Sequence, residues 1–318
     1  MRSVVAGGAG FVGSHLVEAL LRRGDEVIVL DNLSTGSPAN LAHLPTARLT
    51  VLHVDICDEI SGIDNPVDEI YNLAAPASPS DYLRLPLETL RVGSVGVVNT
   101  LELARATGAR YLYSSTSEVY GDPLVHPQPE SYFGNVNPIG PRSVYDESKR
   151  FGEATVTAYR HTHGVDAKIV RVFNTFGPRM RVDDGRAIPN FIDQALRGAP
   201  ITVSGDGSQT RSICYVDDLV NGLIVMMASD IDGPVNLGNP EEFSMLDLAR
   251  WIRRLTDSSS PIEFIERPVD DPEMRRPVID LAYELLGWRP TTTAEVGLKQ
   301  TIGAAVAERE TLRSAFST

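Results

Sequence analysis

The sequence has few of the residues from which metal sites and disulfide bonds are built. Its 318 residues include only two cysteines, Cys57 and Cys214, and six histidines that form no cluster. Cysteines so far apart do not have the spacing of a metal or redox motif, so we expect no bound metal and a reducing, cytoplasmic environment. Both thiols are predicted to be buried as small apolar side chains.

Long apolar runs and positive charge are scarce as well. No uninterrupted apolar stretch reaches the ~18 residues of a membrane-spanning helix, and the chain begins directly in a predicted strand, so we expect neither a membrane span nor a signal peptide. The 42 acidic residues outnumber the 29 lysines and arginines, which gives a formal net charge of −13. Nucleic acids and anionic membranes bind basic faces, so neither is expected as a partner.

Residues 142–153 carry a tyrosine and a lysine four positions apart. Prolines precede this segment, and residues 144 to 163 are predicted to form a helix, which places Tyr145 and Lys149 on one face. An ammonium group beside a phenol favours the phenolate, which lowers a tyrosine pKa from its ordinary value near ~10 and makes the side chain a usable proton acceptor. The same spacing often occurs by chance in solvated helices, so the catalytic interpretation needs support from the rest of the chain.

The amino-terminal segment predicts a strand, a glycine-rich turn and a helix. An apolar run at residues 3–6 leads into a Gly-x-x-Gly-x-x-Gly motif, and a second predicted strand, residues 26–30, ends at Asp31. Glycines allow the backbone to approach a pyrophosphate, the helix N-terminus supplies amide donors, and the acid accepts a hydrogen bond from a ribose hydroxyl. NAD is favoured over NADP, because the carboxylate would repel a 2′-phosphate and the next residue, Asn32, is not basic.

Strands and helices continue to alternate along the chain. Strands are predicted at residues 49–54, 69–73 and 110–114, and a helix at about 86–107. This alternation predicts an α/β fold with a Rossmann-type doubly wound parallel sheet, whose ligands bind at the carboxyl ends of the strands. The polar run at 114–118 follows a predicted strand and therefore falls at that edge.

The chain is long enough for one large domain or two unequal ones. We expect residues 1–178 to form an NAD-binding domain, with returning segments near 213–239. Residues 179–318 would form mainly a smaller α/β substrate domain.

Several sequence motifs resemble the extended short-chain dehydrogenase/reductases that act on nucleotide sugars. These are the glycine motif at 7–13, Asp31, Tyr145-x-x-x-Lys149 and the string RVFNTFGP at 171–178. More specific strings are similar to nucleotide-sugar glucuronate decarboxylases, the enzymes that make UDP-xylose. They are APAS at 75–78, STSEVYGD at 115–122, GNVNPIGPR at 134–142, PRM at 178–180 and DGR at 184–186. The resemblance covers nearly the whole chain.

The resemblance implies that a nucleotide-linked glucuronate is decarboxylated without net redox change. Oxidation at C4 with NAD creates a ketone β to the carboxylate, which then leaves readily as carbon dioxide, and the cofactor reduces the ketone afterwards. Tyr145 would be the base for the C4 hydroxyl, with Lys149 lowering its pKa and holding the nicotinamide ribose, and Thr116 would hydrogen-bond the C4 oxygen. Ser117 and Glu118 would lie near C5 and C6, for decarboxylation or proton handling.

Other activities of the same superfamily stay open. Related 4,6-dehydratases carry Asp-Glu after the threonine, where this chain has Ser117 and Glu118, and related 4-epimerases usually lack the glutamate. Arg275 would reach the substrate carboxylate, a contact that an epimerase of neutral sugars does not need. A non-catalytic NAD-binding regulator or RNA-associated protein would often lack the tyrosine or the lysine.

The resemblance also assigns the ligand-binding residues. The residues expected to bind the cofactor are Gly7, Gly10, Phe11, Val12, Gly13, Asp31, Asn32, Asp55, Ile56, Leu73, Ala74, Ala75, Tyr145 and Lys149. The residues expected to bind the substrate are Pro76, Asn174, Arg179, Val203, Ser204, Gln209, Arg211 and Arg275. Arg211 is predicted to clamp a phosphate, because a guanidinium can bind two oxygens at once.

The chain departs from the family pattern at two places. Gly93 and Val97 stand where Asn and Thr are usual, which predicts a rearranged helix contact behind Tyr145. Ser204 stands where relatives carry a tyrosine beside the nucleobase, so dTDP-glucuronate stays an alternative to UDP-glucuronate. A homodimer is expected from the family, through a four-helix bundle of the helices at 87–107 and 144–163.

Overall fold

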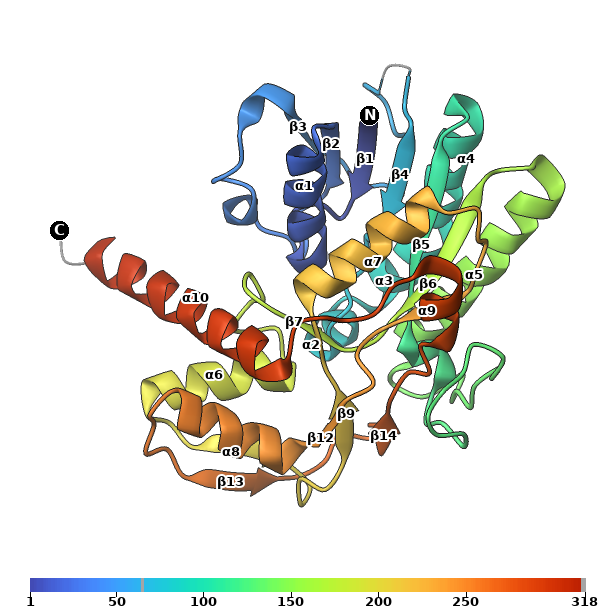
Figure 1. Cartoon of the computed structure of the whole chain (residues 1–318). Helices are drawn as coiled ribbons and strands as arrows, with labels where there is room; N and C mark the ends of the chain where they lie inside the picture. Colours follow the sequence, from blue (N-terminus) through green and yellow to red (C-terminus); the bar gives the residue numbers. More distant parts are fainter. Residues whose placement is uncertain (64–65, 316–318) are drawn as a thin grey trace.

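The computed structural model of the protein describes residues 1–63 and 66–315. Its central layer is a seven-stranded sheet with the order β11-β6-β5-β4-β1-β2-β3, and its strand pairs are parallel (Figure 1). The strands are β1 (Arg2–Ala6), β2 (Glu26–Asp31), β3 (Leu49–His53), β4 (Glu69–Asn72), β5 (Arg110–Thr116), β6 (Ala167–Val172) and β11 (Val235–Leu237). The predicted doubly wound α/β fold is confirmed.

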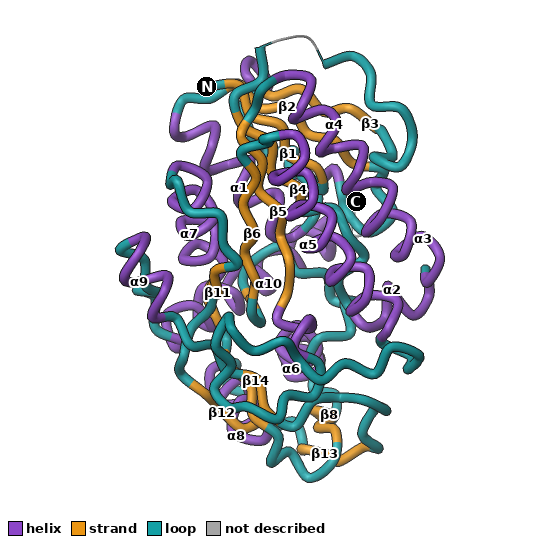
Figure 2. Tube along the Cα trace, turned by 90° about the vertical axis from the view of Figure 1, so that its right-hand side faces the viewer, coloured by secondary structure: helices purple, strands orange, loops and turns teal. Residues whose placement is uncertain are grey.

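Helices cover both faces of this sheet (Figure 2). One face carries α1 (Phe11–Arg23) and α7 (Val216–Ala228), and the other carries α4 (Val97–Thr107) and α5 (Ser143–His163). Apolar side chains at helical spacing, such as Leu16 and Leu20 in α1 and Leu101 in α4, are fully buried against the sheet. Because both faces are covered, β1 and β2 are almost continuous apolar runs, as expected of buried parallel strands.

The helix predicted at about 86–107 is interrupted in its middle by a wider turn. The chain forms α3 (Pro86–Arg91), the π-helical turn η3 (Val92–Gly96) and then α4. Within the wide turn, a Cβ atom on Gly93 would lie 2.5 Å from the Cβ of Ser148 in α5. Glycine at this position therefore allows close contact between the turn and the helix that carries Tyr145 and Lys149.

The second half of the chain adds a smaller lobe below the central sheet (Figure 1). Its sheets have the orders β12-β9-β14 and β13-β8, and a further short pair is β10-β7. These strands are β7 (Thr175–Phe176), β8 (Ile201–Ser204), β9 (Thr210–Ser212), β10 (Cys214–Tyr215), β12 (Glu242–Ser244), β13 (Ile262–Ile265) and β14 (Met274–Arg275). Its helices are α6 (Ala187–Arg197), α8 (Met245–Leu255) and α10 (Ala294–Ala315), whereas α9 (Asp280–Leu286) packs against β11 of the central sheet.

Short helices lie in the connections that follow the sheet strands. They are α2 (Pro79–Arg84) and the 3₁₀ turns η1 (Pro38–Asn40), η2 (Thr46–Arg48) and η4 (Ser117–Tyr120). Because β11 pairs with β6, the chain returns to the central sheet after visiting the smaller lobe. The domain division at residue 178 stays a prediction. Within the described part of the chain, none of the helices combines the length and the apolar character needed to cross a bilayer. Cys57 and Cys214 are free and buried, as predicted.

Candidate active site

A cavity of about 640 Å³ extends from the glycine-rich turn along the carboxyl ends of the sheet strands to the smaller lobe. Of the residues predicted to act in catalysis or binding, all except Val203 line it. They are Gly7, Gly10, Phe11, Val12, Gly13, Asp31, Asn32, Asp55, Ile56, Leu73, Ala74, Ala75, Pro76, Thr116, Ser117, Glu118, Tyr145, Lys149, Asn174, Arg179, Ser204, Gln209, Arg211 and Arg275. Residues from both halves of the chain therefore meet in one space.

The structure does not place the Val203 side chain in the cavity, contrary to its prediction as a substrate-binding residue. Its side chain is completely buried in the core of the smaller lobe instead of facing the cavity. Successive side chains of a strand point to opposite faces, so in β8 Ile201 and Val203 pack inward while Thr202 and Ser204 face the cavity. Thr202 is a cavity residue that the sequence patterns did not reveal.

The glycine-rich turn forms a tight backbone cradle at one end of the cavity. Gly7 has φ +79°, and a Cβ atom there would lie 2.8 Å from the backbone of Ala74. A Cβ atom on Gly13 would lie 2.1 Å from the carbonyl oxygen of Gly7. The helix α1 begins directly after Gly10, which has no side chain to cap it, so its first amides are available to an anion.

Asp31 ends β2 beside this cradle. Its Oδ2 accepts a hydrogen bond from the amide of Ala9 at 2.9 Å, and its Oδ1 accepts one from the amide of Leu33 at 2.8 Å. Burial raises the pKa of Asp31, and these two amides oppose that effect. Each carboxylate oxygen keeps a second lone pair for a ribose hydroxyl, so the predicted geometry of a dinucleotide site is present.

Tyr145 and Lys149 lie on the face of α5 that points toward the end of β5. The Lys149 ammonium donates to the carbonyl of Ser114 at 2.7 Å and lies 5.8 Å from the centre of the Tyr145 ring. Burial lowers the pKa of Lys149 to about 8 and raises the pKa of Tyr145 to about 12. The expected lowering of the Tyr145 pKa by Lys149 is therefore wrong for this geometry, and the groups that do lower it are Thr116, by a hydrogen bond, and Arg186.

Glu118 is the centre of a buried charge cluster beside Tyr145. Arg275 contacts its Oε1 at 2.9 Å, and Arg142 donates to its Oε2 at 2.7 Å. Burial would raise the pKa of Glu118, but the two guanidinium groups outweigh it and bring this pKa to about 2. Arg275 is 1% exposed and also donates to Ser117 Oγ at 3.1 Å and to the carbonyl of Gly121 at 2.8 Å. Glu118 is thus a carboxylate at neutral pH.

Residues 3–238 match the model of the NAD dependent epimerase/dehydratase family. The chain belongs to this family. Its cofactor is NAD, in agreement with the cradle and with Asp31.

The chain is similar to UDP-glucuronic acid decarboxylases from a plant and from an animal. The chain is 51% identical to UDP-glucuronic acid decarboxylase 1 of Arabidopsis thaliana over 303 residues, 95% of this chain and 69% of that protein. It is 49% identical to UDP-glucuronic acid decarboxylase 1 of Xenopus tropicalis over 302 residues, 95% of this chain and 71% of that protein.

Solved structures of other family members have the same fold. UDP-glucose 4-epimerase of Thermotoga maritima, determined with UDP-glucose, aligns with a TM-score of 0.89 at 27% identity, covering 98% of this chain and 100% of the other. The dTDP-glucose 4,6-dehydratase DesIV of Streptomyces venezuelae aligns with a TM-score of 0.87 at 29% identity, covering 98% of both chains.

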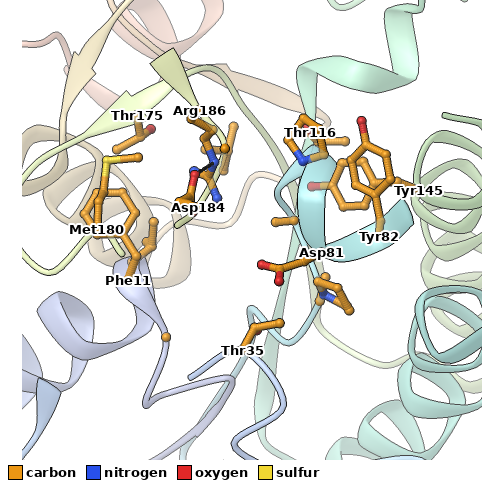
Figure 3. Close-up of a pocket in the computed structure, with 18 of the residues that line it drawn as sticks. Phe11, Thr35, Asp81, Tyr82, Thr116, Tyr145, Thr175, Met180, Asp184 and Arg186 are labelled. Atoms are coloured by element: carbon orange, nitrogen blue, oxygen red, sulfur yellow. Dashed lines mark ion pairs between the residues drawn. The ribbon is translucent and has the colours of Figure 1, made fainter. Parts of the chain in front are cut away.

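One aromatic residue and one basic residue of the site, Tyr82 and Arg142, were not predicted from the sequence. Tyr82 stacks on Tyr145 with ring centres 5.3 Å apart and planes at 9°, and both lie beside Thr116 in the cavity (Figure 3). Tyr82 is 1% exposed, and among the described residues its hydroxyl has no hydrogen-bond partner. Arg142 is the last residue of the motif at 134–142 that supports the resemblance. Its hydrogen bond to Glu118 is visible only in the structure.

Besides Arg275, three of the predicted substrate-binding residues are already paired within the protein. Arg179 contacts Glu18 of α1, which places it next to the dinucleotide cradle. The Arg211 guanidinium donates to Asp271 at 3.0 and 3.1 Å, so a phosphate would have to share or displace this carboxylate. Gln209 donates to the carbonyl of Ser204 at 2.8 Å and thereby fixes the cavity-facing end of β8.

Proposed function

We propose that this protein decarboxylates UDP-glucuronate to UDP-xylose through a 4-keto intermediate, with no net redox change. The observation that carries the proposal is the buried cluster of Ser117, Glu118 and Arg275 beside Tyr145. A fixed guanidinium next to the reacting sugar is what a substrate with a carboxylate requires. About half of the aligned residues are identical to those of UDP-glucuronic acid decarboxylases, which supports UDP-glucuronate as the substrate of this protein as well.

The first half-reaction oxidises C4. NAD, which the glycine cradle and Asp31 would hold, would supply the hydride acceptor for this carbon and the hydride donor once carbon dioxide has left. Tyr145, whose phenolate is favoured by Thr116 and Arg186 against the effect of burial on its pKa, takes the proton of the C4 hydroxyl. Thr116, which lies beside Tyr145 in the cavity, holds the same oxygen. Tyr82 covers the opposite face of the Tyr145 ring and limits the access of water to the base.

The second step breaks the bond between C5 and C6. Arg275 orients the carboxylate, carbon dioxide leaves, and the electron pair stays on the enolate of the C4 ketone. Glu118, with a pKa of about 2, is a poor proton donor at neutral pH, so its role is to position Arg275 and Arg142. Ser117 accepts a hydrogen bond from Arg275, which leaves its own proton free to be donated to C5 and then replaced from solvent. Tyr145 finally returns its proton to the C4 oxygen.

The decisive experiment is incubation with UDP-glucuronate and NAD while carbon dioxide and sugar products are followed. We expect one carbon dioxide and one UDP-pentose per substrate consumed. Tyr145→Phe should abolish oxidation and leave substrate binding nearly intact; near-normal turnover of this variant would remove the assigned base. Accumulation of the 4-ketone without pentose would contradict the roles of Glu118 and Arg275, and a UDP-hexuronate epimer as sole product would show a 4-epimerase.

The nucleotide is the second point to test. Ser204 and Thr202 present small side chains to the cavity, so dTDP-glucuronate is the second candidate substrate. The known dTDP-sugar dehydratase DesIV shares the fold, and the named relatives act on a UDP-sugar. We expect a higher kcat/KM for UDP-glucuronate, and a value for dTDP-glucuronate that equals or exceeds it would overturn this choice.

A homodimer and a cytoplasmic location complete the proposal. Large apolar side chains are exposed on α3, η3 and α5, among them Leu87, Leu90, Val95 and Phe151. A second copy of the same face would cover them in a four-helix bundle. Analytical ultracentrifugation tests the dimer, and the double variant Leu87→Asp with Phe151→Asp should be monomeric. The two free cysteines suit a reducing compartment.

A further inference from the structure

A strap of chain, residues 178–186, connects β7 to α6 and crosses one side of the cavity. Met180, Arg181, Asp184 and Arg186 of this strap all line the cavity. In Figure 3, Met180, Asp184 and Arg186 lie across the cavity from Thr116, Tyr82 and Tyr145. The strap therefore forms a wall of the space that holds both the cofactor and the sugar.

Arg181 ties this strap to two other segments. Its Nη2 donates to both carboxylate oxygens of Asp81 in α2, at 2.9 and 3.0 Å, and its Nη1 donates to the carbonyl of Thr35 at 3.1 Å. A second tie lies next to it, where the Ser80 hydroxyl donates to the carbonyl of Asp184 at 2.8 Å. The three segments are far apart in the sequence, and these contacts join them beside the cavity.

The carboxylate that receives Arg181 is held in place from its own side. Asp81 is 4% exposed, and its Oδ2 accepts a hydrogen bond from Ser78 at 2.8 Å. Burial opposes the ionised form of Asp81, but Arg181, Ser78 and Arg84 outweigh it, so the pKa of Asp81 is lowered. A buried, oriented carboxylate loses little entropy when it pairs, unlike one in an exposed surface salt bridge.

The two segments that Arg181 joins belong to the two functional halves of the cavity. Thr35 precedes Gly36, where a Cβ atom would lie within 3.0 Å of both Asp31 oxygens, so this loop borders the cofactor ribose site. The helix α2 carries Tyr82, which stacks on Tyr145. Opening the Arg181 contact would therefore open the cavity between the cofactor end and the sugar end.

We propose that Arg181 and Asp81 form a latch that holds the strap closed and sets the rate at which NAD leaves the protein. This inference deepens the proposed function, because a decarboxylation without net redox change must keep the reduced cofactor until the ketone is reduced. If the latch opens early, one substrate and one NAD give the UDP-4-ketopentose, carbon dioxide and free NADH. The latch residues thus determine whether the pentose or the ketone is released.

The test compares two arginines that bind the same carboxylate. Arg84 also donates to Asp81 Oδ1 at 3.0 Å, but both residues belong to α2, so this contact joins no separate segments. The holoenzyme is loaded with radiolabelled NAD, chased with excess unlabelled NAD in the absence of any nucleotide sugar, and the release of label is timed. We expect release to be about ten-fold faster in Arg181→Met and within two-fold of wild type in Arg84→Met.

A second variant and a second readout keep the proposal falsifiable. Asp81→Asn removes the charge on the other partner with little change of shape and should also release NAD about ten-fold faster. With UDP-glucuronate, Arg181→Met should release more free NADH and ketone per turnover than Arg84→Met does. Equal NAD release from Arg181→Met, Asp81→Asn and Arg84→Met would overturn the latch. Because NAD release needs no sugar, this result is independent of whether UDP-glucuronate is the substrate.

Discussion

The two ends of the cavity are built in different ways. The cofactor end consists mainly of backbone: a Cβ atom on Gly7 or Gly13 would lie within 2.8 Å of other backbone atoms, and Asp31 ends the next strand, β2. The sugar end consists of charged side chains, with Arg275 brought onto Glu118 from 157 positions away. NAD binding at the cofactor end should therefore depend on the size of the side chains, and the reaction at the sugar end should depend on their charge.

Arg275→Met should give the largest loss, about 1000-fold in kcat of the proposed reaction. Removing one positioned group that stabilises charge at a reacting centre costs about 10²–10³ in kcat, or about 3–4 kcal/mol in the barrier, since ~1.4 kcal/mol is tenfold in rate. Here Ser117 and Glu118 lose the same donor. Steady-state kinetics measures the effect, and Arg276→Met is the matched control because Arg276 does not line the cavity. A loss below tenfold for Arg275→Met would contradict its role at the carboxylate.

Gly13→Ala tests the cofactor end and should weaken NAD binding about 100-fold. The added methyl group would lie 2.1 Å from the Gly7 carbonyl oxygen, so the turn has to move, and overpacking of this kind costs about 1–3 kcal/mol or more. Gly10→Ala is the matched control, since its methyl group would meet only the same oxygen, at 3.2 Å. Isothermal titration calorimetry with NAD should separate the two variants by more than tenfold. Equal affinities of the two variants for NAD would show that the cradle tolerates an added methyl group at position 13.

The pH dependence of stability tests the charge at the sugar end. The folded pKa of Glu118 is about 2, below its ordinary value of 4.5, so its stabilising contribution is present above pH 4.5 and is lost as the pH falls toward 2. This contribution is on the order of a few kcal/mol, because the folded state favours the ionised form of Glu118 over the protonated form. Urea unfolding between pH 5 and 3 should show a shallower loss of stability in Glu118→Gln than in wild type. Parallel curves would mean that Glu118 is not held ionised by Arg275 and Arg142.

The same difference explains how far the sequence predicts the structure. The cradle, Asp31 and the pairing of Tyr145 with Lys149 on one helix face depend on local spacing, so the sequence predicts them. Tyr82 belongs to a six-residue helix without a repeating pattern, and its stacking on Tyr145 depends on the tertiary fold. Burial sets the pKa values of Tyr145 and Lys149, and burial is not visible in a spacing of four residues.

Contacts between segments that are distant in the sequence account for the parts of the site that the sequence does not predict. Arg142 was part of a string that carried the family resemblance, but its partner Glu118 lies 24 positions earlier in the chain. Arg181 and Asp81 are 100 positions apart, and neither stands out by composition or spacing. Val203 was predicted to bind the substrate together with its neighbour Ser204, whereas the pleat of β8 turns the Val203 side chain toward the core. Resemblance identifies the segment, and the strand geometry decides which of its side chains reach the ligand.

Gly93→Ala should give the smallest effect, a destabilisation of about 1–2 kcal/mol and a loss of activity of a few fold. Its Cβ atom would lie 2.5 Å from the Cβ of Ser148, so η3 and α5 would have to separate slightly. Ser148 lies next to Lys149 on α5, and the separation should shift Tyr145 and Lys149 away from Thr116. The double variant Gly93→Ala with Ser148→Gly should restore thermal stability, since it removes the atom that clashes. If the double variant is no more stable than Gly93→Ala alone, glycine at position 93 serves the π-helical turn itself and not the contact with α5.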